Sequence, residues 1–93
     1  MHYTYVLLSD KDRRFYTGYT SDLRERVRLH ELGRVRSTAH RRPTRLVYYE
    51  ACLVRDDALR RERFLKTGKG KRFLRNRLAG FLNTSRQGKL ERH

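Results

Sequence analysis

The apolar residues of this chain are gathered in short runs separated by charged residues, and this pattern limits the fold to one thin core. The hydrophobic fraction is 37%, which is low for a globular protein. A chain of 93 residues makes a single domain that buries roughly two-thirds of its unfolded surface. Six tyrosines and four phenylalanines are more aromatic residues than a disordered chain would carry. We therefore expect a small folded domain with a modest core.

The first part of the chain predicts a β-hairpin. The segment His2–Ser9 (HYTYVLLS) is rich in β-branched and aromatic residues and alternates with period two. A polar turn over 10–13 follows, and Arg14–Tyr19 (RFYTGY) is the second predicted strand. Because so few residues separate the two strands, antiparallel pairing is favoured. Gly18 within the second strand indicates a bulge or the close approach of another group.

A helix and a basic connection come next. Ser21 or Asp22 can cap a helix, and Glu25, three residues after Asp22, completes a capping-box pattern. The helix is predicted to run to about Leu32 and to stop at Gly33, a residue suited to a helix C-terminus. The following segment 34–43 (RVRSTAHRRP) is polar and basic. Its length and charge suit a loop that contacts phosphate better than a packed element.

The rest of the chain predicts a third strand and two more helices. Arg45–Leu53 is the strand, and Asp56 or Asp57 caps a helix over Ala58–Lys66. The sequence TGKG interrupts that helix, and a further helix covers roughly 71–82. Residues 83–93 have little apolar content and are expected to form a flexible tail. The order β-β-α-β-α-α predicts an α+β domain over 1–82.

The charge balance indicates the partner. Twenty-four Lys and Arg residues against ten Asp and Glu leave a formal charge of +14, and basic residues are in excess in every third of the chain. A field of this strength attracts polyanions and makes association depend on salt. Nucleic acid is the expected partner. The alternative is a soluble protein that is merely basic.

Cysteine content and hydropathy indicate the compartment. A lone cysteine, Cys52, permits no intramolecular disulfide and fits a reducing cytoplasm. Its apolar surroundings favour a structural thiol over a nucleophile. The N-terminal segment lacks the apolar run of a signal peptide, and no run reaches the length of a membrane span. We expect a cytoplasmic protein that does not enter the membrane.

Two features point to chemistry. Arg26 and His30 stand four residues apart, beside the apolar stripe of the first predicted helix. Glu62 lies three residues from an apolar neighbour on either side, so its carboxylate is predicted to point inward. An inward carboxylate is costly unless it is paired, protonated or bound to a metal, and pairing with an arginine is the structural alternative.

These residue types match the needs of phosphodiester hydrolysis. That reaction needs a cation to spread the phosphate charge, an oxygen ligand for a divalent metal, and a means of activating water. Arg26 can supply the cation and Glu62 the ligand, since Mg²⁺ often binds a protein through only one carboxylate. Tyr5 and Tyr16, on adjacent predicted strands, could support water activation.

Four segments carry a resemblance to a known family: YTYVLL, FYTGYTSDLRERVRLH, LVYYEA and DDALRRERFLKTGKGKRFL. In their order and spacing they resemble the GIY-YIG nuclease family, in particular its small stand-alone bacterial proteins, over roughly residues 3–80. The first family motif falls on Tyr3-Thr4-Tyr5 and the second on Tyr16-Thr17-Gly18. Gly-Ile of the first motif is Tyr-Thr here, and Thr17 replaces Ile in the second, but the tyrosines and the glycine are kept.

The resemblance implies a small three-stranded antiparallel sheet flanked by helices, and hydrolysis of nucleic acid with one metal ion. It implies that Glu62 holds Mg²⁺ or Mn²⁺ and that Arg26 stabilises the transition state. Tyr5 would be the general base, with Tyr16 and His30 assisting. Because a free tyrosine has a pKa of about 10, Tyr5 needs a neighbouring cation or the metal to act as a base.

Basic residues outside this set are candidates for binding the nucleic-acid backbone. The predicted loop supplies three of them, and the region around TGKG supplies a possible phosphate clamp. They are Arg36, Arg41, Arg42, Lys66, Lys69, Lys71 and Arg72. A solvated, basic helix start is the alternative for the last four. Two competing functions remain for the whole chain: a non-catalytic nucleic-acid-binding module on the same fold, and a structural RNA-binding protein in which Glu62 pairs with an arginine.

Overall fold

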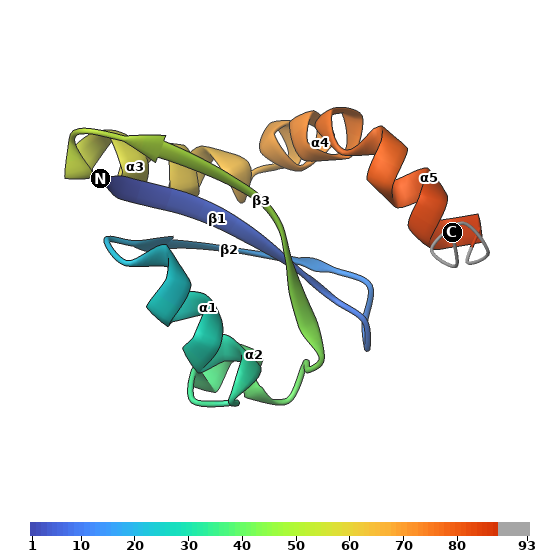
Figure 1. Ribbon diagram of the computed structural model, residues 1–93. Helices are drawn as coiled ribbons and strands as arrows, with labels where there is room; N and C mark the ends of the chain where they lie inside the picture. The colour runs from blue at the N-terminus through green and yellow to red at the C-terminus, as the bar shows by residue number, and fades with distance from the viewer. Residues whose placement is uncertain (88–93) are drawn as a thin grey trace. The chain divides into compact units, whose positions relative to one another are not determined.

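The computed structural model describes residues 1–87 and divides into two compact units, 1–63 and 64–93, each of which is described by itself (Figure 1). The elements in chain order are β1 His2–Ser9, β2 Phe15–Thr20, α1 Leu23–Glu31, α2 Arg36–Ala39, β3 Thr44–Cys52, α3 Arg55–Leu65, α4 Gly68–Arg77 and α5 Ala79–Gln87. The predicted α+β class is confirmed, and so is the order β-β-α-β-α-α, to which the structure adds the short α2 and a division of the last helix.

The sheet of the first unit is antiparallel and three-stranded, with β1 in the centre between β2 and β3. The predicted hairpin between β1 and β2 is confirmed, with Leu8 opposite Phe15 next to the turn. As the central strand, β1 is buried on both faces from Thr4 to Ser9. A bulge between Val6 and Leu7 shifts the pairing of β1 with β3.

The two faces of the sheet are covered by different helices. On one side, α1 brings His30 to within hydrogen-bonding distance of Tyr5. On the other side, the Thr4 hydroxyl donates a hydrogen bond to the Ala58 carbonyl of α3, at 2.8 Å. Figure 1 shows α1 and α3 on opposite sides of the strands. The alternation of β1 thus sends Tyr5 to the face that carries α1.

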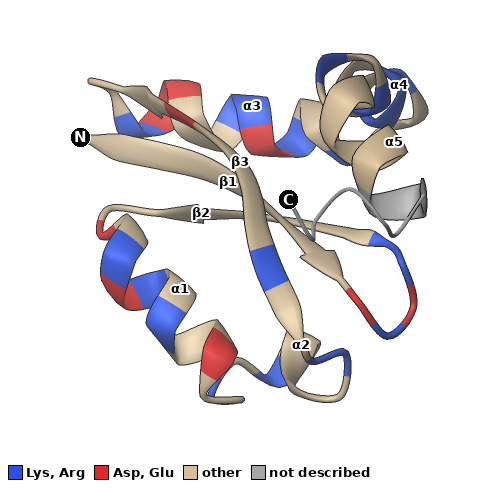
Figure 2. Ribbon diagram, turned by 45° about the vertical axis from the view of Figure 1, so that its right-hand side comes forward, with Lys and Arg blue, Asp and Glu red and all other residues tan. Residues whose placement is uncertain are grey.

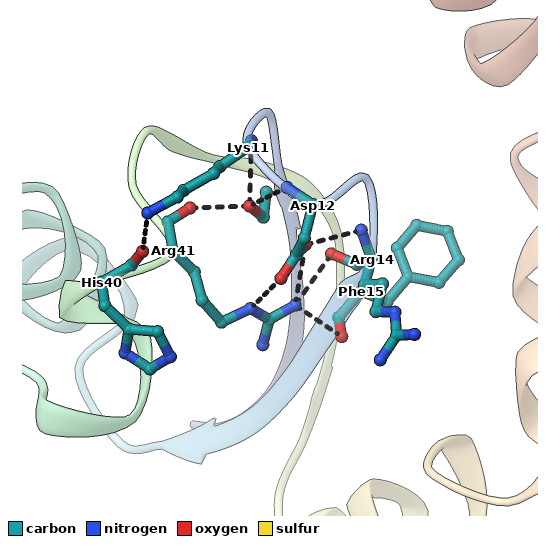
Figure 3. Close-up of polar contacts among 7 residues, drawn as sticks. Lys11, Asp12, Arg14, Phe15, His40 and Arg41 are labelled. Atoms are coloured by element: carbon teal, nitrogen blue, oxygen red, sulfur yellow. Dashed lines mark hydrogen bonds and ion pairs between the residues drawn. The ribbon is translucent and has the colours of Figure 1, made fainter.

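The segment 34–43, predicted to be a loop, is instead a packed element. It contains the four-residue helix α2, and both Val35 and Thr38 are buried. Arg41 fixes it to the β1–β2 turn, because its guanidinium donates to the Asp12 carboxylate at 2.8 Å and to the carbonyls of Arg14 and Phe15 (Figure 3). The prediction was wrong because these contacts join segments far apart in the chain.

That junction has further hydrogen bonds at its edges. The Ser9 hydroxyl donates to the Arg41 carbonyl at 2.6 Å, and the Lys11 ammonium donates to the His40 carbonyl at 3.0 Å (Figure 3). The Arg41 guanidinium also lowers the pKa of Asp12 to about 2. The β1–β2 turn therefore holds α2 in place, and α2 carries a residue of the candidate site.

The second unit begins within α3 and continues through α4 and α5. Thr67 caps α4, and its hydroxyl accepts the amide of Gly70 at 3.1 Å. Gly70 lies so close to the end of α3 that a Cβ there would meet the Phe64 carbonyl at 2.1 Å. The helix predicted over 71–82 is thus two helices, α4 and α5, divided at Leu78.

The predicted flexible tail only partly falls on described residues. Residues 83–87 belong to α5, and 88–93 lie outside the described residues. Among residues 1–87, no helix has the length and hydropathy that are needed to cross a bilayer.

Candidate functional site

The structure brings four of the predicted catalytic residues into one cluster within the first unit. The Tyr5 hydroxyl lies 2.7 Å from His30 Nε2 and 3.3 Å from Arg26 Nε. The Tyr16 ring packs edge-on against His30, with centroids 5.3 Å apart, and lies 6.4 Å from the Tyr5 ring. β1 and β2 supply the tyrosines, and α1 supplies the arginine and the histidine.

The lack of a side chain at Gly18 lets the Tyr5 ring extend toward Arg26 and His30. Tyr5 and Gly18 are directly opposite each other in the β1–β2 pairing. A Cβ at Gly18 would lie 2.5 Å from the Tyr5 hydroxyl oxygen, so the phenol ring crosses the space that a side chain would fill. The sequence predicted a bulge or a close approach at this glycine, and the close approach is the outcome.

Burial governs the charge state of Tyr5. The side chain has no exposed surface, and this burial raises the pKa of Tyr5 to about 12, while the Arg26 hydrogen bond acts in the opposite direction. Tyr5 is therefore a neutral phenol at physiological pH. It is a hydrogen-bonding group and not a ready-made phenolate.

His30 is also buried and neutral. Its Nδ1 lies 2.7 Å from the hydroxyl oxygen of Thr38, a fully buried residue of α2. Burial, followed by the positive charge of Arg26, lowers the pKa of His30 to about 4. A neutral imidazole carries a hydrogen on only one nitrogen, so its two neighbours decide which nitrogen donates.

The hydrogen bonds of this cluster can be read as one chain of donors that runs from Arg26 to the Val35 carbonyl. Arg26 Nε–H can only donate to the Tyr5 oxygen, so the Tyr5 proton is free to point at His30 Nε2. His30 then donates from Nδ1 to Thr38, whose own hydroxyl donates to the Val35 carbonyl at 3.5 Å. In this direction each donor of the chain has an acceptor, which favours the Nδ1–H tautomer of His30.

Arg26 is positioned by the start of α1. The Asp22 side chain caps the helix by accepting the Glu25 amide at 3.1 Å, as the capping pattern in the sequence predicted. From this helix, the half-buried Arg26 side chain interacts with Tyr5 and Tyr16, and these interactions raise its pKa. A permanently charged, partly desolvated guanidinium is suited to binding a phosphate oxygen.

Glu62 lies on α3, and its negative charge interacts with Tyr5 of the cluster. The carboxylate is half-buried, and it is one of the groups that raise the pKa of Tyr5. The neighbouring Arg61 pairs instead with Glu50, through two nitrogens at 2.8–3.1 Å. Among residues 1–87, no group of three or more His, Cys, Asp and Glu side chains is arranged as a metal site. Glu62 is thus a half-buried carboxylate whose charge acts on the phenol of Tyr5.

Thr38 is the residue of this cluster that sequence reasoning missed. It stands in a segment read as a basic loop, where a threonine has no periodic pattern to mark it as buried. Contacts of Arg41 with the distant β1–β2 turn hold the segment of α2 from which Thr38 meets His30. The neighbouring Ser37 also approaches the site, since its hydroxyl lies 3.4 Å from the Tyr16 hydroxyl.

The basic residues predicted to bind the nucleic-acid backbone fall into different environments. In the first unit, Arg36 is exposed on α2, whereas the guanidinium of Arg41 is engaged within the protein and Arg42 donates to the Ala39 and Glu31 carbonyls. In the second unit, the candidates from the TGKG region are all exposed: Lys66, Lys69, Lys71 and Arg72. Figure 2 shows blue segments along α1 and α4.

Comparison with known proteins gives consistent results. Residues 1–78 match the family model described as the GIY-YIG catalytic domain. A UPF0213 protein of Staphylococcus haemolyticus is 40% identical over 67 residues, which cover 71% of this chain and 80% of the relative. A UPF0213 protein of the archaeon Haloquadratum walsbyi is also 40% identical, over 71% of this chain and 74% of its own length. No solved structure matches the chain at a significant level.

Proposed function

The chain belongs to the GIY-YIG nuclease family, and on that premise we propose that it is a divalent-metal-dependent endonuclease that hydrolyses phosphodiester bonds in DNA. The observation that carries the proposal is the buried chain of hydrogen bonds from Arg26 through Tyr5 and His30 to Thr38, beside the half-buried Glu62. A module that only binds nucleic acid needs exposed basic groups and has no use for this buried arrangement.

Arg26 would act on the phosphate. The pentavalent transition state of phosphodiester hydrolysis carries more charge on its equatorial oxygens than the ground state, and a fixed guanidinium stabilises that charge without reorganising. The Nε–H of Arg26 donates to the Tyr5 hydroxyl, and the terminal nitrogens of a guanidinium are suited to binding phosphate oxygens. This geometry supports a transition-state role.

Tyr5 would orient the attacking water and relay its proton. With a pKa of about 12, the phenol can accept a proton from water only as its own proton moves to His30 Nε2. Burial and Arg26 oppose charge on His30, and the negative charge of a bound phosphate would offset that opposition. Thr38 would keep Nε2 free of hydrogen, so that it can receive the proton.

The residues present fit a single Mg²⁺ or Mn²⁺ ion. Mg²⁺ is commonly bound through one or two carboxylates together with substrate phosphates and waters, and a half-buried Glu62 offers one carboxylate. Bound there, the ion would act as a Lewis acid that neutralises charge on the phosphate. Glu62 would be the residue of this chain that holds it.

The deciding experiment is a cleavage assay on branched, duplex and single-stranded DNA and on matching RNA, with Mg²⁺, Mn²⁺ or EDTA. We expect cutting that requires the metal and is abolished in Arg26→Ala. Binding without cutting by the wild-type protein under all these conditions would favour the alternative function, a non-catalytic nucleic-acid-binding module. Cutting of RNA alone would retain the nuclease and reject DNA as the substrate.

The role of Thr38 leads to a first prediction. Thr38→Val keeps the shape of the side chain but removes the acceptor of the His30 Nδ1–H, so we expect cleavage to slow about 10- to 100-fold, within the range that positioned proton transfer contributes. The measurement is the single-turnover rate, together with ¹⁵N NMR of His30, which reports the tautomer directly.

Two controls separate positioning by Thr38 from a loss of folding. Thr38→Ser keeps the hydroxyl and should restore both the rate and the Nδ1–H signature. The unpaired donor in Thr38→Val also costs about 1–3 kcal/mol of stability, so rates are compared at a temperature where both variants are folded. A valine variant with the wild-type tautomer and rate would remove Thr38 from the mechanism.

The net charge leads to a second prediction, on binding. If six phosphates are contacted, for example, affinity for duplex DNA should fall on the order of 10³-fold between 50 and 200 mM salt, with little dependence on sequence. Arg36→Gln and Lys69→Gln remove exposed charges and should each reduce the salt slope by about one. Arg41→Gln should instead lower the melting temperature and leave the slope unchanged, because its guanidinium is engaged within the protein. A flat salt response would contradict the electrostatic model.

A further inference from the structure

A cleft of the first unit lies on the same face of the sheet as the candidate site. It has a volume of about 650 Å³ and lies between α1 and the strands β1 and β3. Both the helix and the strands contribute apolar residues to its lining: Tyr3, Leu23, Val27, Leu46 and Tyr49. The volume is in the range of clefts that hold small organic groups.

Tyr49 is the most open part of this lining. Its side chain is 52% exposed although it is a large aromatic residue in a strand, and its ring centroid lies 6.1 Å from that of Tyr3 at an angle of 60°. Leu46 beside it is also exposed. The protein thus leaves an aromatic face and a small apolar surface open to solvent in a hollow, where a flat ring could stack.

The cleft is continuous with the candidate site through two elements. Tyr49 on β3 is directly opposite Tyr5 on β1, and side chains at such positions have Cβ atoms about 4.5–5.5 Å apart on the same face. On α1, the helix that carries Arg26 also carries Val27, which lines the cleft. A strand whose phosphate lies at Arg26 would therefore have neighbouring nucleotides within reach of the cleft.

The charges at the rim indicate which part of a nucleotide fits. Arg24 and Arg28 line the cleft, but Arg28 is held by Glu25 through two hydrogen bonds, and the carboxylates of Asp22 and Glu31 lie on the same rim. Carboxylates repel a phosphate group, whereas an apolar wall with an open aromatic ring suits a base. The exposed Arg24 can hold the backbone outside.

We propose that this cleft receives an unpaired nucleobase of the bound strand, stacked on Tyr49, so that the substrate has single-stranded nucleotides next to the phosphate that is cut. A paired base cannot make this contact, because both of its faces are stacked within the duplex. The position of the cut rests on the proposed function, but the stacking itself does not need cleavage and can be measured without it.

The test uses short DNA that contains the fluorescent base 2-aminopurine, in EDTA, so that no metal-dependent cutting occurs. The probes are a single strand, a duplex with a single-stranded flap, and a blunt duplex. We expect wild type and Tyr49→Phe to quench the fluorescence of the unpaired probe, and Tyr49→Ala to lose the quenching. Tyr49→Ala should also weaken binding of the single strand and flap about 5- to 150-fold, from the 1–3 kcal/mol that one stacked base contributes, and leave the blunt duplex within about twofold.

Leu53→Ala is the matched control, because Leu53 is 81% exposed and is not among the residues that line the cleft. It should bind and quench like wild type. The inference is overturned if Tyr49→Ala weakens all three probes equally or none, or if Tyr49 instead mediates self-association in sedimentation experiments. Quenching by a wild-type protein that never cuts with Mg²⁺ or Mn²⁺ would reject the nuclease and keep the cleft. Metal-dependent cutting of blunt duplex and flap alike, without dependence on Tyr49, would keep the nuclease and reject the cleft as a site for an unpaired base.

Discussion

Arg26→Ala is expected to slow cleavage by at least about 100-fold, the cost of removing one preorganised group that stabilises transition-state charge. Affinity for nucleic acid should change little, because Arg26 is one of 24 basic residues. The fold should also persist, since the side chain is only half-buried and donates to the hydroxyl of Tyr5, which keeps His30 as a partner. The measurements are single-turnover cleavage, binding in EDTA, and thermal unfolding.

Two further variants define what Arg26 supplies. Arg26→Lys keeps the charge but loses the planar, two-nitrogen geometry, so it should bind like wild type and recover only a small part of the rate. Arg34→Ala removes an exposed arginine of the same unit and should cut like wild type. If Arg26→Ala cuts as fast as Arg34→Ala, Arg26 does not stabilise the transition state and its assignment from the family fails.

Local patterns in the sequence predicted the parts of the fold that depend on near neighbours. β1 was predicted with its observed bounds, because alternation and β-branched residues mark a strand within eight positions. The start of α1 followed from Asp22 and Glu25, whose capping hydrogen bond is present. The i, i+4 spacing of Arg26 and His30 likewise placed both side chains where Tyr5 meets them.

Contacts between distant segments explain what the sequence did not predict. α2 has only four residues, and its place depends on Arg41 reaching Asp12, 29 residues away in the chain. Thr38 was missed for this reason. The state of Tyr5 was also out of reach, because a rise of its pKa to about 12 comes first from burial, which only the packed structure reveals.

Sequence patterns also could not separate the roles of Glu50 and Glu62, and these two residues offer a matched pair for experiment. Glu50 lies in a visible network, in which it accepts from Arg61 and from the Tyr48 hydroxyl at 2.7 Å. Glu62 lies on α3 and acts on Tyr5 through its charge. From the sequence alone, an inward glutamate in an arginine-rich chain could be either a structural partner or a metal ligand. Glu50 is a structural partner of Arg61, and Glu62 is the metal ligand that we propose.

Glu62 is the proposed metal ligand, and we expect Glu62→Gln to abolish metal-dependent cleavage, because a neutral amide cannot replace the carboxylate that would hold the ion. Glu50 differs because it is one partner of a partly buried ion pair, and its removal leaves the charge of Arg61 uncompensated. Glu50→Gln should show the opposite result: a lower melting temperature, with near wild-type cleavage per folded molecule. The measurements are thermal unfolding in EDTA, cleavage across a Mg²⁺ and Mn²⁺ titration, and Mn²⁺ binding by electron paramagnetic resonance, which needs no activity. A Glu62→Gln protein that melts early but binds Mn²⁺ and cuts normally once folded would make Glu62 a structural residue and leave the metal without its proposed ligand.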